Sequence, residues 1–281
     1  MYTLPKLVTS LFPSALIFAV IPFTNVDLAF AAQSQQPSSD VHYSVPQIAQ
    51  WDFIQFILPP SYQGSPSTGR ARGGASRGNC PTVETPLTTL VPYVTTQEGE
   101  SSVTQSIVGL TSSLYPTFWF YVPYELSIDL PAEFLLLDDE GNYLYTKTLT
   151  ETVSSAGIIQ VSLPTTIAPL EVGKTYRWTF QVMCEANNPI ATWGEIQRVA
   201  IDNSLETQIE QSSPRDQAAL YAANGIWYEA LTTLANLRIA EPTNESIDAD
   251  WHSFLESAGL ADIADAPLLP CCAPISETIP Q

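Results

Sequence analysis

Alternation of apolar and polar residues predicts short β-strands over much of the chain. The clearest case is the segment 175–183, in which Tyr176, Trp178, Phe180 and Val182 alternate with polar side chains. Apolar residues with a period of two are typical of a strand with one buried face. Similar short runs, separated by Gly, Pro and Asn, are found at residues 52–58, 133–137, 143–146 and 158–163.

Two local patterns refine this prediction. The run 117–122 carries aromatic residues at successive positions and ends at Pro123, which is typical of a central strand covered on both faces. The sequence 138–142, Asp-Asp-Glu-Gly-Asn, lies between two strand candidates. Gly and Asn at such a position predict the turn of a β-hairpin.

Residues 170–180 resemble the turn and late strand of immunoglobulin-like sandwiches, in which a tyrosine forms a tyrosine corner. Tyr176 holds the place of that tyrosine, and Trp178 stands where such domains carry a cysteine. We therefore predict that residues 51–205 form an immunoglobulin-like antiparallel β-sandwich without the usual inter-sheet disulfide.

After residue 205 the apolar residues recur every three to four positions, which predicts helices over residues 206–270. Ser213 as N-cap and Pro214 at the first helical position begin one helix. A second helix runs from 226 to about 239, and a third lies around Trp251.

The first two helices resemble one tetratricopeptide repeat, with a small residue at Ala218, Gly225 at the turn and Pro242 after the second helix. A single repeat cannot bury its own apolar face. This hairpin therefore packs on the sandwich, on the third helix or on a partner.

The first segment predicts export. Lys6 precedes an apolar run that reaches Ala29-Phe30-Ala31, a small-x-small cleavage site. Cleavage after Ala31 removes a signal peptide, residues 1–31, and leaves a flexible linker, residues 32–50. No later apolar stretch approaches the roughly 18 residues needed to span a bilayer. We expect a soluble periplasmic or extracellular protein, with an uncleaved amino-terminal anchor as the alternative.

The charge balance excludes one class of partner. The chain has 29 acidic and 10 basic residues and a formal net charge of −19. Nucleic-acid binding rests on clustered Lys and Arg that neutralise phosphates. We therefore expect no nucleic-acid partner.

In an oxidising compartment the four cysteines are expected to form disulfides. Adjacent cysteines are poorly placed to bond to each other, so we predict that Cys80 and Cys184 each bond to one member of the Cys271-Cys272 pair. That pairing ties the tail, residues 271–281, to the main domain. Zinc is the rival reading, but the two histidines, His42 and His252, and the cysteines show no metal-ligand spacing.

Cations are concentrated in a Gly/Arg-rich loop, residues 64–79, of an otherwise acidic chain. Arginine and aromatic side chains most often anchor protein interfaces. The predicted partner-binding residues are therefore Arg70, Arg72 and Arg77 of this loop and Trp227, Tyr228 and Trp251 of the helices. In the alternative, the loop folds over the acidic surface of the protein itself.

The sequence assigns no catalytic, metal-binding or cofactor-binding residue. It contains only two histidines, which disfavours a histidine-based triad. The acidic residues 138–140 could serve a glycoside hydrolase, which needs two carboxylates, but a hairpin turn explains them equally well. We predict a non-catalytic protein-binding or adaptor module of the cell envelope, with a carboxylate-dependent envelope hydrolase as the alternative.

Four segments together resemble one known family: residues 73–80 (GGASRGNC), 116–124 (PTFWFYVPY), 225–231 (GIWYEAL) and the final Cys271-Cys272. The family is a cyanobacterial one catalogued as domain of unknown function 928, and the resemblance covers roughly residues 51–272. It implies an exported cyanobacterial protein, and it implies no activity, ligand or catalytic residue.

Overall fold

The computed structural model describes residues 52–59, 69–73, 80–98, 102–150, 153–184 and 188–270. The predicted signal peptide, the linker, Arg77 and the tail with Cys271 and Cys272 lie outside these residues.

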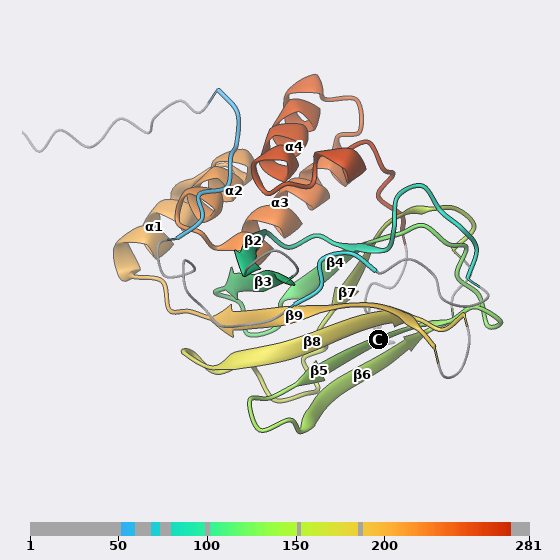
Figure 1. The fold of residues 1–281 in the computed structure, drawn as a ribbon. Helices are drawn as coiled ribbons and strands as arrows, with labels where there is room; N and C mark the ends of the chain where they lie inside the picture. Colours follow the sequence, from blue (N-terminus) through green and yellow to red (C-terminus); the bar gives the residue numbers. More distant parts are fainter. Residues whose placement is uncertain are drawn as a thin grey trace, which may run out of the picture. The chain divides into compact units, whose positions relative to one another are not determined.

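The described residues form two β-sheets followed by four helices (Figure 1). The smaller sheet has the order β1 (Thr88–Thr89), β4 (Thr117–Val122) and β7 (Gly157–Ser162). The larger sheet has the order β2 (Tyr93–Glu98), β3 (Ser102–Thr111), β9 (Ile190–Arg198), β8 (Thr175–Val182), β5 (Ala132–Leu137) and β6 (Tyr143–Leu149). All pairs are antiparallel except β3 and β9, which run parallel. The purely antiparallel prediction is wrong at this pair, because the long connection between the two strands permits a parallel arrangement.

The helices are α1 (Asn203–Gln211), α2 (Pro214–Ala223), α3 (Trp227–Ala240) and α4 (Glu245–Ser257), followed by a short 3₁₀ turn. The predicted N-cap is confirmed, since the Ser213 side chain accepts a hydrogen bond from the Asp216 N–H, with Pro214 next in the chain. α1 was not predicted as a helix; it begins at Asp202, whose carboxylate accepts from two backbone N–H groups. No helix in the described part of the chain is long and apolar enough to cross a membrane.

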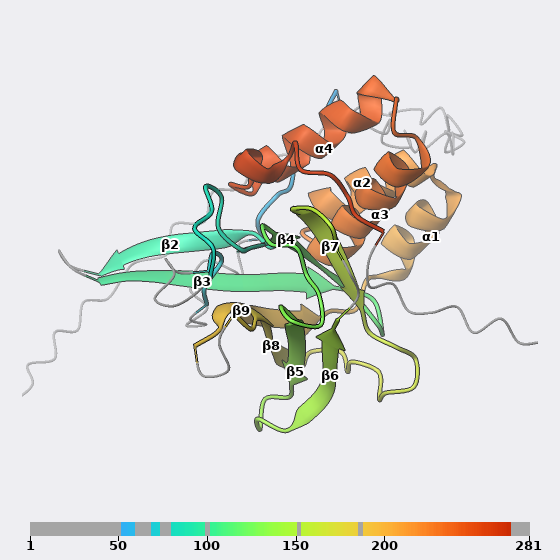
Figure 2. The ribbon, with the colours of Figure 1, turned by 90° about the vertical axis from the view of Figure 1, so that its right-hand side faces the viewer.

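The alternation predicted for β8 is confirmed, because Tyr176, Trp178, Phe180 and Val182 are all buried. Figure 2 shows β4 and β7 lying between the helices and strands β5, β6 and β8. Aromatic side chains of β5 and β8 therefore fill the space between the two sheets, where such side chains contribute a large buried apolar area.

β4 is covered on both faces, as its aromatic run predicts. On one face the Phe118 ring lies 4.8 Å from the Phe134 ring, and Phe120 stacks on Phe180 at 4.1 Å. On the other face Trp119 Nε1 donates to Thr232 Oγ1 of α3 over 3.0 Å. The helical layer thus packs directly on the smaller sheet.

The predicted hairpin turn joins β5 to β6. Asp138 N donates to the Asn142 carbonyl over 3.0 Å, and Gly141 has a φ of 88°. The Asp138 carboxylate accepts from Asn142 Nδ2 and Asn142 N, and these hydrogen bonds lower the pKa of Asp138 below its ordinary value. Turn geometry accounts for the acidic residues of this segment.

Residues 54–59 form an extended segment on the helices, which we call the strap, and they are not a strand (Figure 1). Ile54 N donates to Asp250 Oδ1 over 3.1 Å, Phe56 N to Ser257 Oγ over 2.8 Å, and Ile57 N to the Ala222 carbonyl over 3.2 Å. The strand prediction for 52–58 is wrong, because the backbone of the strap binds helix residues instead of another strand.

Side chains of the strap complete the helical layer. The Phe56 ring lies 4.9 Å from Trp227 and 6.3 Å from Phe254. Pro59 packs against Gly225, where an added Cβ would lie 2.1 Å from Pro59 Cγ, and Gly225 has a φ of 73°. Only glycine fits this turn, because other residues meet both a clash and an unfavourable backbone conformation.

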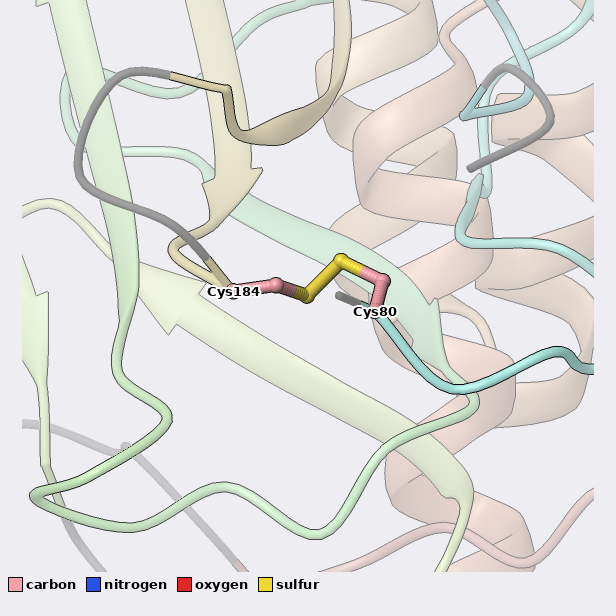
Figure 3. The surroundings of a disulfide bond; sticks show 2 residues. All are labelled: Cys80 and Cys184. Atoms are coloured by element: carbon pink, nitrogen blue, oxygen red, sulfur yellow. A yellow bond between two sulfur atoms is a disulfide. The ribbon is translucent and has the colours of Figure 1, made fainter. Parts of the chain in front are cut away.

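The disulfide links Cys80 to Cys184, with the Cα atoms 5.2 Å apart (Figure 3). The predicted pairing of both cysteines with the Cys271-Cys272 pair is therefore wrong. Cys184 follows β8, and the chain just before the smaller sheet passes the end of that strand, so the two cysteines meet without the tail.

Candidate functional site

Two of the three predicted loop arginines contact the protein itself. Arg72 makes two hydrogen bonds to the Asp262 carboxylate, at 2.6 and 2.7 Å. The Arg70 guanidinium lies 4.7 Å from the centre of the Trp193 ring, a cation–π contact. Arg77 lies outside the described residues. These contacts fit a loop that folds over the protein's own surface, and binding of an acidic partner by the loop stays a prediction.

The three predicted partner-binding aromatics are core residues, so the prediction that they anchor a partner is wrong. Trp227, Tyr228 and Trp251 are each at most 1% exposed. Trp227 Nε1 donates to the Leu90 carbonyl, and the Tyr228 ring lies 5.2 Å from Phe118. Helical spacing shows that a face is apolar, but it does not show what covers that face. Here Trp227 and Tyr228 meet the strap and the segment of the smaller sheet, and Trp251 Nε1 donates to the Ala264 carbonyl.

A cleft lies where the ends of β3 and β9 meet the first two helices. The cavity has a volume of about 430 Å³, within the size range of ordinary ligand sites. Its walls are formed by Ser112, Val172, Arg198, Val199, Ala200, Ile201, Glu206, Ile209, Glu210 and Tyr221. We call it the Arg198 cleft.

Arg198, the last residue of β9, is a half-buried cation held by two backbone carbonyls. Its Nε donates to the Ser112 carbonyl over 3.2 Å, and its Nη1 donates to the Leu170 carbonyl over 2.9 Å. Within the described ranges no ion pair includes Arg198. Fully buried charges are nearly always paired, and Arg198 is partly withdrawn from water with only carbonyl partners among the described residues, in a chain of net charge −19.

The peptide group that holds Arg198 is itself held by a half-buried carboxylate. Glu229 of α3 accepts from Thr111 Oγ1 at 2.5 Å, from Ser112 N at 3.1 Å and from Ser113 N at 3.1 Å. Burial raises the pKa of Glu229, and these hydrogen bonds oppose the rise. Ser112 is therefore fixed on both sides, by Glu229 at its N–H and by Arg198 at its carbonyl.

A second wall of the Arg198 cleft belongs to α1 and α2. Glu206 and Glu210, one turn apart on α1, line the cavity with exposed side chains, while Ile209 of the same helix is buried. Tyr221 of α2 completes this wall, and burial, then the charge of Glu229, raises the pKa of its hydroxyl. The cleft thus has a cation on one wall and two carboxylates on the other.

The charged side chains of the Arg198 cleft can bind a ligand that carries charged groups. In the part of the chain that the structure describes, no group of three or more His, Cys, Asp or Glu residues could hold a metal ion. The two glutamates come from one helix and hence from one wall. Arginine binds carboxylates in bidentate fashion, which is the clearest capability of this site.

The model of the family described as Domain of Unknown Function (DUF928) matches residues 72–268. The chain belongs to the DUF928 family. No curated protein matches the chain. The DUF928 match includes Arg198, Glu229 and every other residue that lines the Arg198 cleft, whereas the strap and Arg70 precede it.

Sequence reasoning missed both Arg198 and Glu229. Arg198 ends the apolar and polar alternation of β9, a strand that was not predicted individually from the sequence. A usable signal was present, since Arg198 is one of only 10 basic residues and stands at the end of a strand. Glu229 gave no such signal, because nothing local distinguishes it from a solvent-exposed helical glutamate.

The pair between Arg72 and Asp262 predicts a pH-dependent contribution to stability. The Arg72 guanidinium holds the pKa of the Asp262 carboxyl below its ordinary value. The pair therefore stabilises the fold at pH values above the ordinary aspartate pKa of about 3.9 and loses its effect as the pH falls through the lower folded-state pKa. We expect Arg72→Gln to lower the free energy of unfolding at pH 7 by less than about 1 kcal/mol, and by less still near pH 3.

Urea unfolding of Arg72→Gln and the wild type at both pH values measures this difference. Arg70→Gln is the matched control, because a cation–π contact does not titrate in this range. A loss for Arg72→Gln that is equal at pH 7 and pH 3 would contradict the assignment.

Proposed function

We propose that this DUF928 protein is an exported, non-catalytic protein-binding or adaptor module of the cell envelope, and that it binds its partner at the Arg198 cleft. The observation that carries the proposal is Arg198 itself, a half-buried guanidinium held by two backbone carbonyls in a chain of net charge −19. Withdrawing a charge from water costs free energy, and a counter-charge offsets this cost. A partner that supplies a carboxylate meets this need.

Exposed apolar residues beside the cleft support a protein as the partner. Val172, which lines the cleft, is 51% exposed, and Leu114 on the neighbouring loop is 44% exposed. The two loops are joined by the hydrogen bond from Leu170 N to the Leu114 carbonyl, at 3.1 Å. Protein interfaces have an apolar core and are enriched in arginine, and this patch offers exposed apolar side chains next to Arg198.

Export is supported by the Cys80–Cys184 disulfide, because such bonds persist outside the cytosol. It agrees with the signal peptide that the sequence predicts at residues 1–31. The periplasm and the exterior of the cell are both compatible with this proposal.

We also propose an immunoglobulin-like sandwich with a tetratricopeptide-like helical hairpin. Glu171 N donates to the Tyr176 hydroxyl over 2.8 Å, a bond of the kind found in a tyrosine corner. Gly225 at the α2–α3 turn supports the comparison for the hairpin. A fold does not by itself imply a function, so the binding proposal rests on Arg198.

A carboxylate-dependent hydrolase has weaker support. Glycoside hydrolases place two carboxylates on either side of the scissile bond. Glu206 and Glu210 lie on one helix, and the acidic residues 138–142 form a hairpin turn. The two carboxylates of the Arg198 cleft therefore do not face each other across it, as a glycoside hydrolase would need.

Replacing Val172 with glutamate tests the proposed binding site. The substitution adds a carboxylate to the cleft wall, so it competes for Arg198 and removes an apolar contact. We expect recovery of the partner to fall at least about tenfold, since loss of one interface anchor costs on the order of 2 kcal/mol. The measurement is crosslinking in intact cells of the source organism, followed by purification of the tagged full chain from the envelope.

Ile128→Glu is the matched control, because Ile128 is 78% exposed and is not a cleft residue. The control should recover the partner as the wild type does. Equal recovery by Val172→Glu and wild type, or no partner with any version, would contradict the proposed function.

A further inference from the structure

We propose that the Arg198 cleft binds a peptide segment that carries a carboxylate and a basic group a few residues apart. Arg198 binds the carboxylate, and Glu206 with Glu210 binds the basic group. The assignment of this ligand rests on the proposed function and adds the chemistry of the segment that is recognised.

The carboxylate is assigned to Arg198 because some N–H groups of the guanidinium form no hydrogen bond with the described residues. An arginine has five N–H donors in a planar fork, and the protein bonds of Arg198 use Nε and Nη1. Nη2 has no protein partner among the described residues. A carboxylate matches the remaining edge of the fork, and partial burial shields the contact from salt.

The guanidinium is already in position before any ligand arrives. Its two carbonyl acceptors lie on separate loops, at Ser112 and Leu170. Glu229 fixes Ser112 through its N–H, at 3.1 Å. Little side-chain entropy is lost when such a group binds, so even a short ligand can be held.

The basic group is assigned to the wall formed by α1. Glu206 and Glu210 are four residues apart, so their side chains lie on the same side of the helix. Neither forms an ion pair with any described residue. These two carboxylates and an arginine that forms no ion pair with a described residue give the cleft a negative wall and a positive wall.

This division of charge selects a dipolar ligand over a simple anion. Phosphate or a polyanion approaching Arg198 meets Glu206, Glu210 and a chain of net charge −19. A ligand with both signs gains at both walls. The aliphatic residues Val172, Ile201 and Ile209 line the space between, which suits the apolar part of a peptide.

The test measures binding of short peptides to the full chain by calorimetric titration. The probes are acetylated, amidated peptides in which Lys and Glu are separated by one, two or three alanines. The same peptides with Glu replaced by Gln, or with Lys replaced by Gln, are the ligand controls. We expect at least one Lys/Glu peptide to bind, and each control peptide to bind at least about tenfold more weakly.

Variants of the protein show which charged group of the peptide binds at which wall. We expect Arg198→Lys to weaken binding of the Lys/Glu peptide about tenfold, because lysine lacks the planar fork. The double variant Glu206→Gln with Glu210→Gln should weaken it severalfold and leave binding of the peptide with Gln in place of Lys unchanged. Glu245→Gln with Glu256→Gln on α4, also exposed, is the control and should bind as the wild type does.

If Arg198→Lys fails to fold, the double variant Glu206→Gln with Glu210→Gln still tests the proposal, because both side chains are exposed. Inorganic phosphate that displaces the peptide at equal concentration would overturn the proposal, and so would equal binding of the charge-deleted peptides. If no peptide binds while Val172→Glu still loses the partner, this assignment is wrong and the proposed function stands. If the peptide binds as expected and no envelope partner is recovered, the assignment stands and the adaptor function is wrong.

Discussion

Replacing Asp250 with alanine should lower the free energy of unfolding by about 3 kcal/mol, because it breaks a buried ion pair. The Asp250 side chain is 1% exposed. It accepts from Arg215 Nε at 2.6 Å, from Arg215 Nη2 at 2.9 Å and from Ile54 N at 3.1 Å. The variant removes one of the three acceptors that join the strap to the helices. Urea unfolding followed by tryptophan fluorescence measures the change.

Asp265→Ala is the matched control, since that side chain is 94% exposed and its loss should change stability by less than about 0.5 kcal/mol. Limited proteolysis adds a local measurement, and the strap should be cut faster in Asp250→Ala than in the control. A stability of Asp250→Ala within 0.5 kcal/mol of the wild type would show that Asp250 does not hold the strap.

Removing the disulfide should have a similarly large effect. Cys80 and Cys184 are 104 residues apart in the sequence, and closing a loop of about 100 residues contributes roughly 4 to 5 kcal/mol, largely through the unfolded state. We expect Cys80→Ser with Cys184→Ser to lower the Tm by about 10 to 20 °C. Differential scanning calorimetry under non-reducing conditions measures this change.

The tail cysteines supply the control for the disulfide. In Cys271→Ser with Cys272→Ser, peptide mapping should still recover the bond between Cys80 and Cys184. The Tm of this variant should stay close to that of the wild type. If the tail variant loses as much stability as the other, the bond between Cys80 and Cys184 is not the one that stabilises the protein.

Elements defined by local pattern could be predicted from the sequence. The alternation in β8, the doubly aromatic β4 and the turn at residues 138–142 each carry their own signal within about ten residues. Ser213 and Pro214 likewise mark the start of α2. In these cases the deciding interactions lie close in the sequence.

Features that depend on distant contacts could not be predicted. Ile54 and Phe56 alternate as in a strand, yet the surface that covers them is helical. Trp227 follows helical spacing whether its face meets solvent, a partner or the smaller sheet. Arg198 becomes notable only because, among the residues that the structure describes, no carboxylate pairs with it. The sequence alone does not contain this property.

The position of the strap has a consequence for the order in which the protein can fold. Ile54 is 196 residues from Asp250, and Phe56 is 201 residues from Ser257. A chain leaves the ribosome from its amino end, so the strap is made before any residue of α2, α3 or α4. Its apolar side chains have no helical surface to cover them until almost the whole described chain has emerged. Docking of the strap is therefore one of the last events of folding, and a nascent chain halted before α4 keeps Ile54 and Phe56 available to other chains.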